Sequence, residues 1–69
     1  MNKIKLDIYN GVMDLVNKNL TLLQIADNMS DWKIDTISNN RLTLSKWVGV
    51  NHICISIFYG DCIRNVTVF

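Results

Sequence analysis

The chain has 69 residues, a formal net charge of +1 and 49% hydrophobic residues. This length fits one domain with a thin core, because so short a chain buries only about 60% of the surface that its unfolded form exposes. The hydrophobic content excludes a disordered tail, and the absence of any run of basic residues argues against a dedicated nucleic-acid-binding surface. We therefore expect a single domain over residues 1–69.

The N-terminal segment lacks the features of a secretory signal, because Asp7 interrupts the first apolar residues and no continuous apolar segment follows. The longest apolar runs are a few residues, whereas a membrane-spanning helix needs about 20. We therefore expect a cytoplasmic protein with no membrane segment, whose two cysteines stay reduced.

The composition is biased toward residues with AT-rich codons. Nine Asn and nine Ile stand against one Ala and no Pro. Small AT-rich genes are common in bacteriophages and other mobile elements, although low-GC bacterial genomes share this bias. We expect a phage or mobile-element product that acts inside a bacterial host cell.

Residues 3–18 have the spacing of an amphipathic helix, with polar side chains every three or four residues and apolar side chains on the opposite stripe. The polar positions are Lys3, Asp7, Asn10, Asp14 and Asn17, and the apolar stripe is Ile4, Ile8, Val12, Leu15 and Val16.

A strand competes with this first helix. Residues 3–9 also alternate, and the Asn-Gly dipeptide at positions 10–11 is a strong hairpin signal. In that layout residues 3–9 form a strand and residues 12–29 one long helix. The hairpin would place Asp7 opposite Asp14, and a like-charge pair costs stability. We therefore favour the helix.

Residues 21–29 are expected to form a second, short helix. Thr21 followed by Gln24 is the pattern of a capping box, in which each side chain bonds the other residue's backbone N–H.

Residues 32–37 and 41–47 alternate as two strands of a hairpin. A three-residue loop over residues 38–40 pairs Ile34 with Leu44 and Thr36 with Leu42, and it places apolar side chains on one face. A two-residue loop at positions 39–40 would mix polar and apolar side chains on both faces.

The C-terminal residues form the clearest hairpin, with strands over residues 52–59 and 62–69. Gly at position 60, followed by Asp61, suits a type II′ turn. That turn pairs Ile53 with Val68, Ile55 with Val66, Ile57 with Arg64 and Tyr59 with Cys62. The opposite face then carries His52, Cys54, Ser56, Phe58, Ile63, Asn65, Thr67 and Phe69.

These elements predict a two-layer α+β domain, with the N-terminal helices packed on one face of a four-stranded antiparallel sheet. The alternatives are the β-α-β-β-β-β order and a winged helix. The predicted core comprises Ile4, Ile8, Val12, Leu15, Leu23, Ile25, Trp32, Ile34, Leu42, Leu44, Ile53, Ile55, Ile57, Val66 and Val68.

The candidate chemical groups are His52, Cys54 and Cys62, whose side chains are possible zinc ligands. The predicted register places Cys62 on the face opposite Cys54, which separates the set. His52 is the only histidine, and nothing near it would lower a thiol pKa for nucleophilic catalysis. We expect no metal site, no cofactor and no enzymatic activity.

Residues 20–37 loosely resemble the first two helices of a helix-turn-helix motif. This resemblance implies a winged-helix-like DNA-binding regulator, in which residues 32–40 form a helix. Its phosphate contacts would be Lys33, Arg41, Lys46 and Arg64. The balanced charge favours a different partner, and nucleic acid is not the expected one.

The leading functional hypothesis is a non-enzymatic protein-binding module that inhibits a bacterial host protein or defence system. It depends on a solvent-facing sheet surface with apolar side chains among polar neighbours, which is typical of an interface. The expected contact residues are Ile37, Trp47, His52, Phe58, Ile63 and Phe69. The same face would alternatively join two copies into a homodimer.

Overall fold

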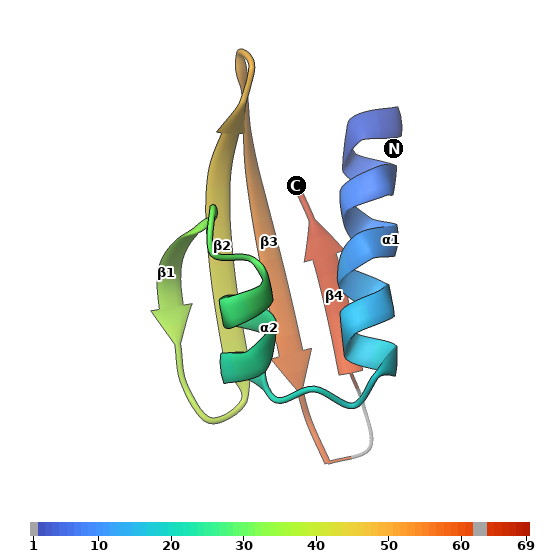
Figure 1. Cartoon of the computed structure of the whole chain (residues 1–69), viewed down its shortest axis with the longest axis vertical. Coiled ribbons are helices and arrows are strands. Elements are labelled where there is room, and N and C mark those ends of the chain that lie inside the picture. The colour runs from blue at the N-terminus through green and yellow to red at the C-terminus, as the bar shows by residue number, and fades with distance from the viewer. Residues whose placement is uncertain (1, 62–63) are drawn as a thin grey trace.

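The computed structural model describes residues 2–61 and 64–69. Its elements are α1 (Lys3–Asn17), α2 (Leu22–Asn28), β1 (Lys33–Ile37), β2 (Arg41–Val48), β3 (Asn51–Tyr59) and β4 (Arg64–Val68). The strands form one antiparallel sheet in the order β1-β2-β3-β4. In Figure 1, α1 runs beside β4 and α2 lies in front of β2. The predicted α+β fold is confirmed.

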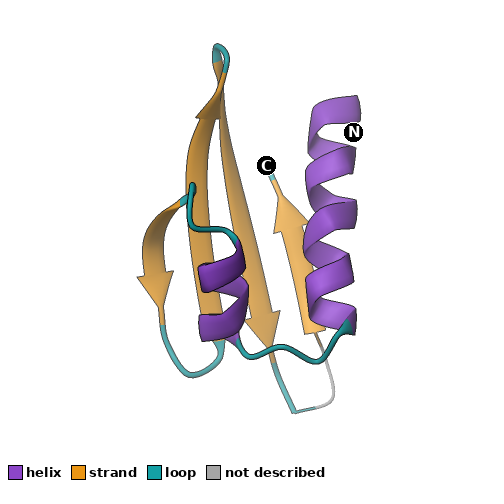
Figure 2. Ribbon diagram, viewed as in Figure 1, coloured by secondary structure: helices purple, strands orange, loops and turns teal. Residues whose placement is uncertain are grey.

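Both alternative folds are wrong. Residues 3–9 belong to a helix and not to a strand, as Figure 2 shows. Helical spacing places Ile8 on the same stripe as the buried Val12 and Val16. Residues 33–37 form a strand at the edge of the sheet, so the third helix of a winged-helix motif does not exist.

Each helix begins at a residue whose side chain satisfies free backbone N–H groups. The Asn2 side chain accepts a hydrogen bond of 2.9 Å from the Lys5 N–H. At the start of α2, Thr21 and Gln24 form the predicted capping box, with N–O distances of 3.2 and 2.9 Å. Such caps typically contribute about 1 kcal/mol each.

The core lies between the helices and one face of the sheet. Its buried hydrophobic side chains are Val12, Val16, Leu22, Ile25, Ala26, Met29, Leu42, Leu44, Ile53, Ile55, Ile57 and Val68. Ile8, Leu15, Trp32 and Val66, which were also predicted in the core, are half-buried around it. At about 25 cal/mol per Å² of buried apolar surface, such side chains supply most of the driving force for folding.

Leu23 was wrongly predicted to lie in the core, since 68% of it is exposed. The buried positions of α2 are Leu22, Ile25 and Ala26, and Met29 follows at the same helical spacing. Residues at i, i+3, i+4 and i+7 share one face of a helix, so Leu23 points to solvent.

Ile4 and Ile34 were also wrongly predicted in the core, with exposed fractions of 41% and 47%. Ile4 lies in the first turn of α1. The helix has 15 residues and so spans about 22 Å, whereas the five residues of β4 span about 17 Å, and the helix end extends past the strand. Ile34 lies on the edge strand β1, outside the part of the sheet that α2 covers.

The β1–β2 hairpin has a register shift between Ile34 and Thr36. Ile34 pairs with Leu44, as predicted, but the predicted pairing of Thr36 with Leu42 is wrong because Ile37 pairs with Leu42 instead. One extra residue in a strand changes the face of every later side chain. Ile37 therefore points to the helix side and not to the opposite face on which it was predicted.

The β3–β4 hairpin has the predicted faces but not the predicted pairs. Ile55 pairs with Val68, Ile57 with Val66, and Tyr59 with Arg64. This register differs from the predicted one by two residues, and a shift of two leaves each side chain on its own face. The predicted two-residue loop at Gly60 and Asp61 is wrong, because Tyr59 pairs with Arg64 and not with Cys62. Cys62 itself falls outside the described residues.

Arg64 and Tyr59 join the β3–β4 hairpin to the helical layer. Arg64 Nη1 donates to the Asn19 side-chain oxygen at 2.7 Å and to the Val16 carbonyl at 3.2 Å. The Tyr59 hydroxyl donates to the Leu20 carbonyl at 2.9 Å. The Arg64 guanidinium also lies 5.0 Å from the centre of the Tyr59 ring. These contacts explain why the two-residue shift is favoured: it places Arg64 opposite Tyr59.

Candidate protein-binding face

The face of the sheet opposite the helices is called the open face. It consists of alternate residues, because directly paired residues of an antiparallel sheet point to the same side. From the strand pairs, its members are Lys33 and Thr36 on β1, Arg41, Thr43, Ser45 and Trp47 on β2, His52, Cys54, Ser56 and Phe58 on β3, and Asn65 and Thr67 on β4.

The open face carries four of the six predicted contact residues: Trp47, His52, Phe58 and Phe69. Phe69 belongs to it because its backbone exchanges two hydrogen bonds with Cys54, at 2.7 and 2.9 Å. Ile37 lies on the helix side, for the reason given above. Ile63 lies outside the described residues.

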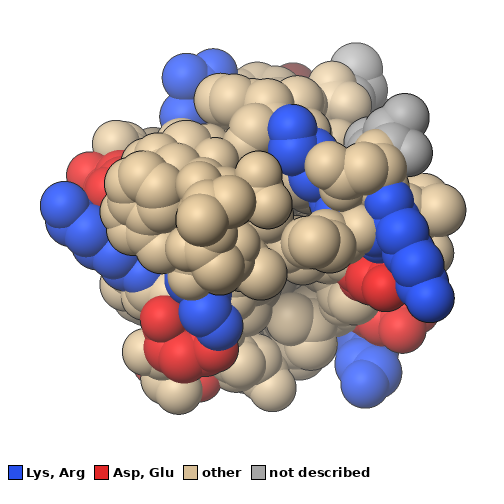
Figure 3. Space-filling model, turned by 90° about the horizontal axis from the view of Figure 1, so that it is seen from above, with Lys and Arg blue, Asp and Glu red and all other residues tan. Residues whose placement is uncertain are grey.

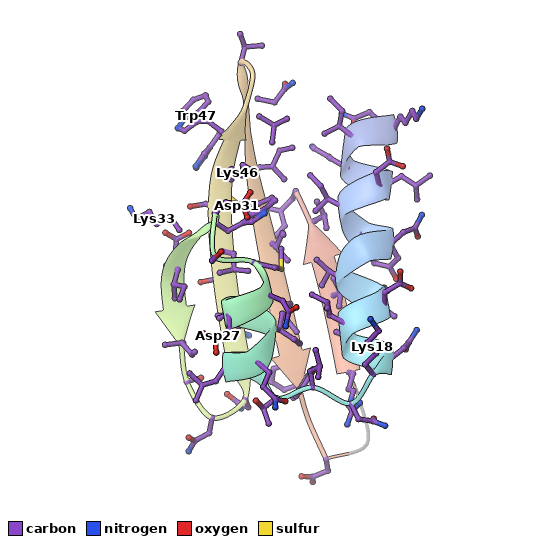
Figure 4. The ribbon with its side chains drawn as sticks, viewed as in Figure 1. Lys18, Asp27, Asp31, Lys33, Lys46 and Trp47 are labelled. Carbon is purple, nitrogen blue, oxygen red and sulfur yellow. The ribbon has the colours of Figure 1, made fainter. Side chains whose placement is uncertain are left out.

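Trp47 stands on a hairpin arm, defined as residues 46–53, that extends beyond the outer strands. On one side, the β1–β2 pairs begin with Lys33 and Ser45. On the other side, the C-terminal segment ends with the hydrogen bonds between Phe69 and Cys54, so neither outer strand pairs with residues 46–53. The arm turns at Gly49, whose φ of 62° is a left-handed conformation that Gly adopts without strain. In Figure 4 the indole of Trp47 points away from α1.

Trp47 is 66% exposed, and its ring packs against His52, its direct partner across the arm. Their ring centroids lie 4.9 Å apart at an interplanar angle of 33°. Aromatic pairs favour such offset and tilted arrangements over a face-to-face sandwich. The indole therefore has one aromatic neighbour, while most of the residue's surface remains available to a partner.

The kind of side chain on the rest of the open face changes along the strands. Next to the arm, a recess of about 400 Å³ is lined by Asp31, Lys33, Asp35, Ser45, Lys46, Trp47 and His52. The middle of the face is a row of small hydroxyl side chains across all four strands: Thr36, Thr43, Ser56 and Thr67. At the far end, the Arg41 guanidinium lies 5.9 Å from the centre of the Phe58 ring. The large side chains thus stand at the two ends of the face.

Asp31 and Lys46 form an ion pair at the border of this recess. The Lys46 side chain also lies over the Trp32 ring, 5.7 Å from its centre. The hydrogen bond from the Lys46 side chain is the main cause that lowers the pKa of the Asp31 carboxyl, and a hydrogen bond from the Asp31 backbone adds to the effect.

We predict that the carboxyl carbon of Asp31 titrates below the ordinary range of an aspartate in an NMR titration, and that Lys46→Gln moves its midpoint upward. A lowered folded-state pKa favours folding above the unfolded value of 3.8, and this contribution disappears as the pH falls through the folded value. Lys18→Gln, which removes a charge elsewhere, is the control and should leave the midpoint unchanged. An unchanged midpoint in Lys46→Gln would contradict the pairing.

The candidate catalytic and metal-binding residues do not form a larger site within the described part of the chain. His52 and Cys54 share the open face, and Cys54 is a half-buried free thiol. Cys62 lies outside the described residues. No cluster of three or more His, Cys, Asp or Glu side chains occurs among residues 2–61 and 64–69. In the same residues, no helix combines the length and apolar character needed to cross a membrane.

On the face that Figure 3 shows, positive and negative side chains are interspersed. Two of the four cations that were predicted to contact DNA are engaged on the helix side, Lys46 with Asp31 and Arg64 with the end of α1. Lys33 lies on the open face, with its Nζ 3.9 Å from the Asp35 carboxylate. The four cations therefore do not form one basic surface.

Comparison of the chain with known protein families, characterised proteins and solved structures gives no significant match.

Proposed function

We propose that this chain is a small, non-enzymatic protein-binding module that uses its open face to bind and inhibit a bacterial host protein. The main support is Trp47, which exposes two thirds of its surface at the base of a protruding arm and packs there against His52. Exposed, rigidly held aromatic residues are the side chains that contribute most to binding at protein interfaces.

The AT-rich composition supports the origin of the module in a bacteriophage or mobile element, whose product acts in the host cytoplasm on a host protein or defence system. The surroundings of Trp47 have the composition of an interface. Charged side chains such as Asp31 and Lys33 form a polar rim, and Phe69, 59% exposed, extends the apolar part across the face.

A homodimer through the same face is the second candidate. Its support is the size of the chain: a 69-residue domain has a thin core, and joining two copies would bury additional apolar surface. The homodimer and the host-protein complex predict different masses for the purified chain, so one set of variants separates them.

The decisive experiment compares Trp47→Ser with Leu23→Ser. Both remove a large exposed side chain, but Leu23 lies on α2, on the opposite side of the sheet. The wild-type chain would be used to capture proteins from bacterial lysates, and each captured protein would then be purified and titrated against the variants by calorimetry. We expect Trp47→Ser to weaken binding by roughly 30-fold, equivalent to a hot spot of about 2 kcal/mol, with an unchanged melting temperature. Leu23→Ser should bind like the wild type.

Light scattering of the purified chain tests the homodimer. A dimeric mass that Trp47→Ser reduces to that of a monomer, with a melting temperature that then falls, would favour the homodimer over the host-protein complex. If Trp47→Ser and Phe58→Ser change neither mass nor binding relative to Leu23→Ser, the open face is ordinary surface and the proposal is wrong.

A further inference from the structure

A second recess of the open face lies at the end opposite the arm. It has a volume of about 270 Å³ and is lined by Arg41, Ser56, Phe58, Asn65 and Thr67, from three neighbouring strands. Among the described residues of this lining, Arg41 is the one charged residue, and none of them is a carboxylate. The recess differs in this respect from the one beside Trp47, where two Asp and two Lys side chains meet.

Arg41 is the donor-only side chain of this recess, and Asn65, Ser56 and Thr67 can each donate as well as accept hydrogen bonds. The guanidinium of Arg41 offers up to five N–H groups, the Asn65 amide two, and the Ser56 and Thr67 hydroxyls one each. The Phe58 ring lies below the guanidinium at 5.9 Å, which restricts its position while leaving its N–H edge available. A planar guanidinium with additional donors nearby suits two-point recognition of a carboxylate.

We propose that this recess binds the carboxylate of an Asp or Glu side chain of the protein partner. This inference rests on the proposed function and adds the chemistry of the partner's surface. Arg41 and Trp47 lie on the same face of β2, six residues apart, which is about 20 Å at the usual rise of a strand. The partner would therefore present an acidic side chain about 20 Å from the apolar or aromatic group that contacts Trp47.

A single cation favours a protein carboxylate over a nucleic acid. A nucleic-acid strand carries a charge at every phosphate and binds through several Lys or Arg side chains together. Here Lys46 and Arg64 are engaged on the other face, and Lys33 lies near Asp35 at the distant end. Within residues 2–61 and 64–69, the Arg41 guanidinium on the open face has no carboxylate partner, and the polar side chains of Ser56, Asn65 and Thr67 lie in the same recess.

The test is an NMR titration of the 69-residue chain with N-acetylglutamate N-methylamide, which carries one carboxylate and no other charge. We expect saturable shift changes at the backbone amides of Ser56, Asn65 and Thr67. Arg41→Gln should abolish them. Lys18→Gln, which removes the same charge from the end of α1, should preserve them. Arg41→Lys keeps the charge without the planar guanidinium and should weaken the binding several-fold.

Two parallel titrations distinguish other ligands. If a single-stranded oligothymidylate binds through Arg41 more tightly than the glutamate derivative, the recess serves a nucleic acid and the proposal is overturned. Shift changes with inorganic phosphate that equal those with the carboxylate, or changes that persist in Arg41→Gln, also overturn it. These outcomes overturn the carboxylate site and not the proposed function. The proposed function is tested separately, by the effect of Trp47→Ser on binding to the captured host protein.

Discussion

Replacing Leu22 with alanine is expected to destabilise the protein strongly, whereas the same substitution at the adjacent Leu23 should have almost no effect. Leu22 is 6% exposed and Leu23 is 68% exposed, although both lie in the first turn of α2. Removing a buried leucine side chain costs about 2–4 kcal/mol, since the apolar transfer free energy is lost and a cavity remains. A core in so small a domain rarely supplies more than about 3–5 kcal/mol in total.

Thermal unfolding measures this difference directly. For a domain of this size, a loss of 2–4 kcal/mol lowers the melting temperature by roughly 10–25 °C, whereas an exposed substitution changes the stability by at most about 0.5 kcal/mol. Each variant serves as the control for the other, because residue type, helix and turn are the same. A larger loss for Leu23→Ala would mean that α2 packs with the predicted orientation, in which Leu23 faces the sheet.

The elements of this fold could be predicted from the sequence because each has a clear hydrophobic period. The apolar stripe of residues 3–17 repeats every three to four residues, and the strands alternate. The orientation of α2 could also have been obtained. Leu22, Ile25, Ala26 and Met29 have the spacing of a single helix face, but a broad apolar surface that includes Leu23 concealed it.

Strand registers were harder to predict, and the two hairpins show different reasons. In the β3–β4 hairpin, a shift of two residues preserves every face, so alternation alone does not distinguish the registers. The contacts of Arg64 with Val16 and Asn19, which favour the observed register, join residues that lie far apart in the sequence. In the β1–β2 hairpin, the bulge near Asp35 changes the face of Ile37. Ile34 and Ile37 are three residues apart, whereas side chains on one face of a regular strand are separated by an even number of residues. This odd spacing is the sequence signal for an extra residue.

These differences explain which parts of the candidate site could be predicted. Trp47, His52 and Phe58 lie on the predicted face because β2 and β3 alternate without interruption. Arg41 was considered only as a phosphate contact. Its position above Phe58 depends on the cross-strand pair of these two residues, which the sequence alone did not specify.

Replacing Arg64 with alanine is expected to cost about 1–2 kcal/mol, reduced by the exposure of its side chain, which would be the largest effect of any charged residue in the described part of the chain. Its guanidinium donates to the Asn19 side-chain oxygen and to the Val16 carbonyl, which also accepts from the Asn19 N–H, at the C-terminal end of α1. Hydrogen bonds that involve a charged group contribute about 1.5–3 kcal/mol. Asn19 has a left-handed φ of 59°, which this contact helps to hold.

Arg41→Ala is the matched control for Arg64→Ala, because it removes the same side chain from the exposed open face, and we expect it to cost less than about 1 kcal/mol. Urea unfolding of both variants gives the free energies, and Arg64→Lys should fall between Arg64→Ala and the wild type because it keeps the charge but not the two-point contact. Equal losses in Arg64→Ala and Arg41→Ala would contradict the role of Arg64 as the link between β4 and α1.

The Tyr59 hydroxyl provides an independent measurement of the same link. Burial raises its pKa above 10, and the neighbouring Arg64 charge partly opposes this rise. Arg64→Ala should therefore raise the pKa of Tyr59 further in an ultraviolet titration. Because the folded-state pKa is the higher one, the contribution of Tyr59 to stability is present below pH 10 and is lost as the pH rises through the folded value. A pKa of Tyr59 that falls or stays constant in Arg64→Ala would show that the guanidinium does not lie over this ring in solution.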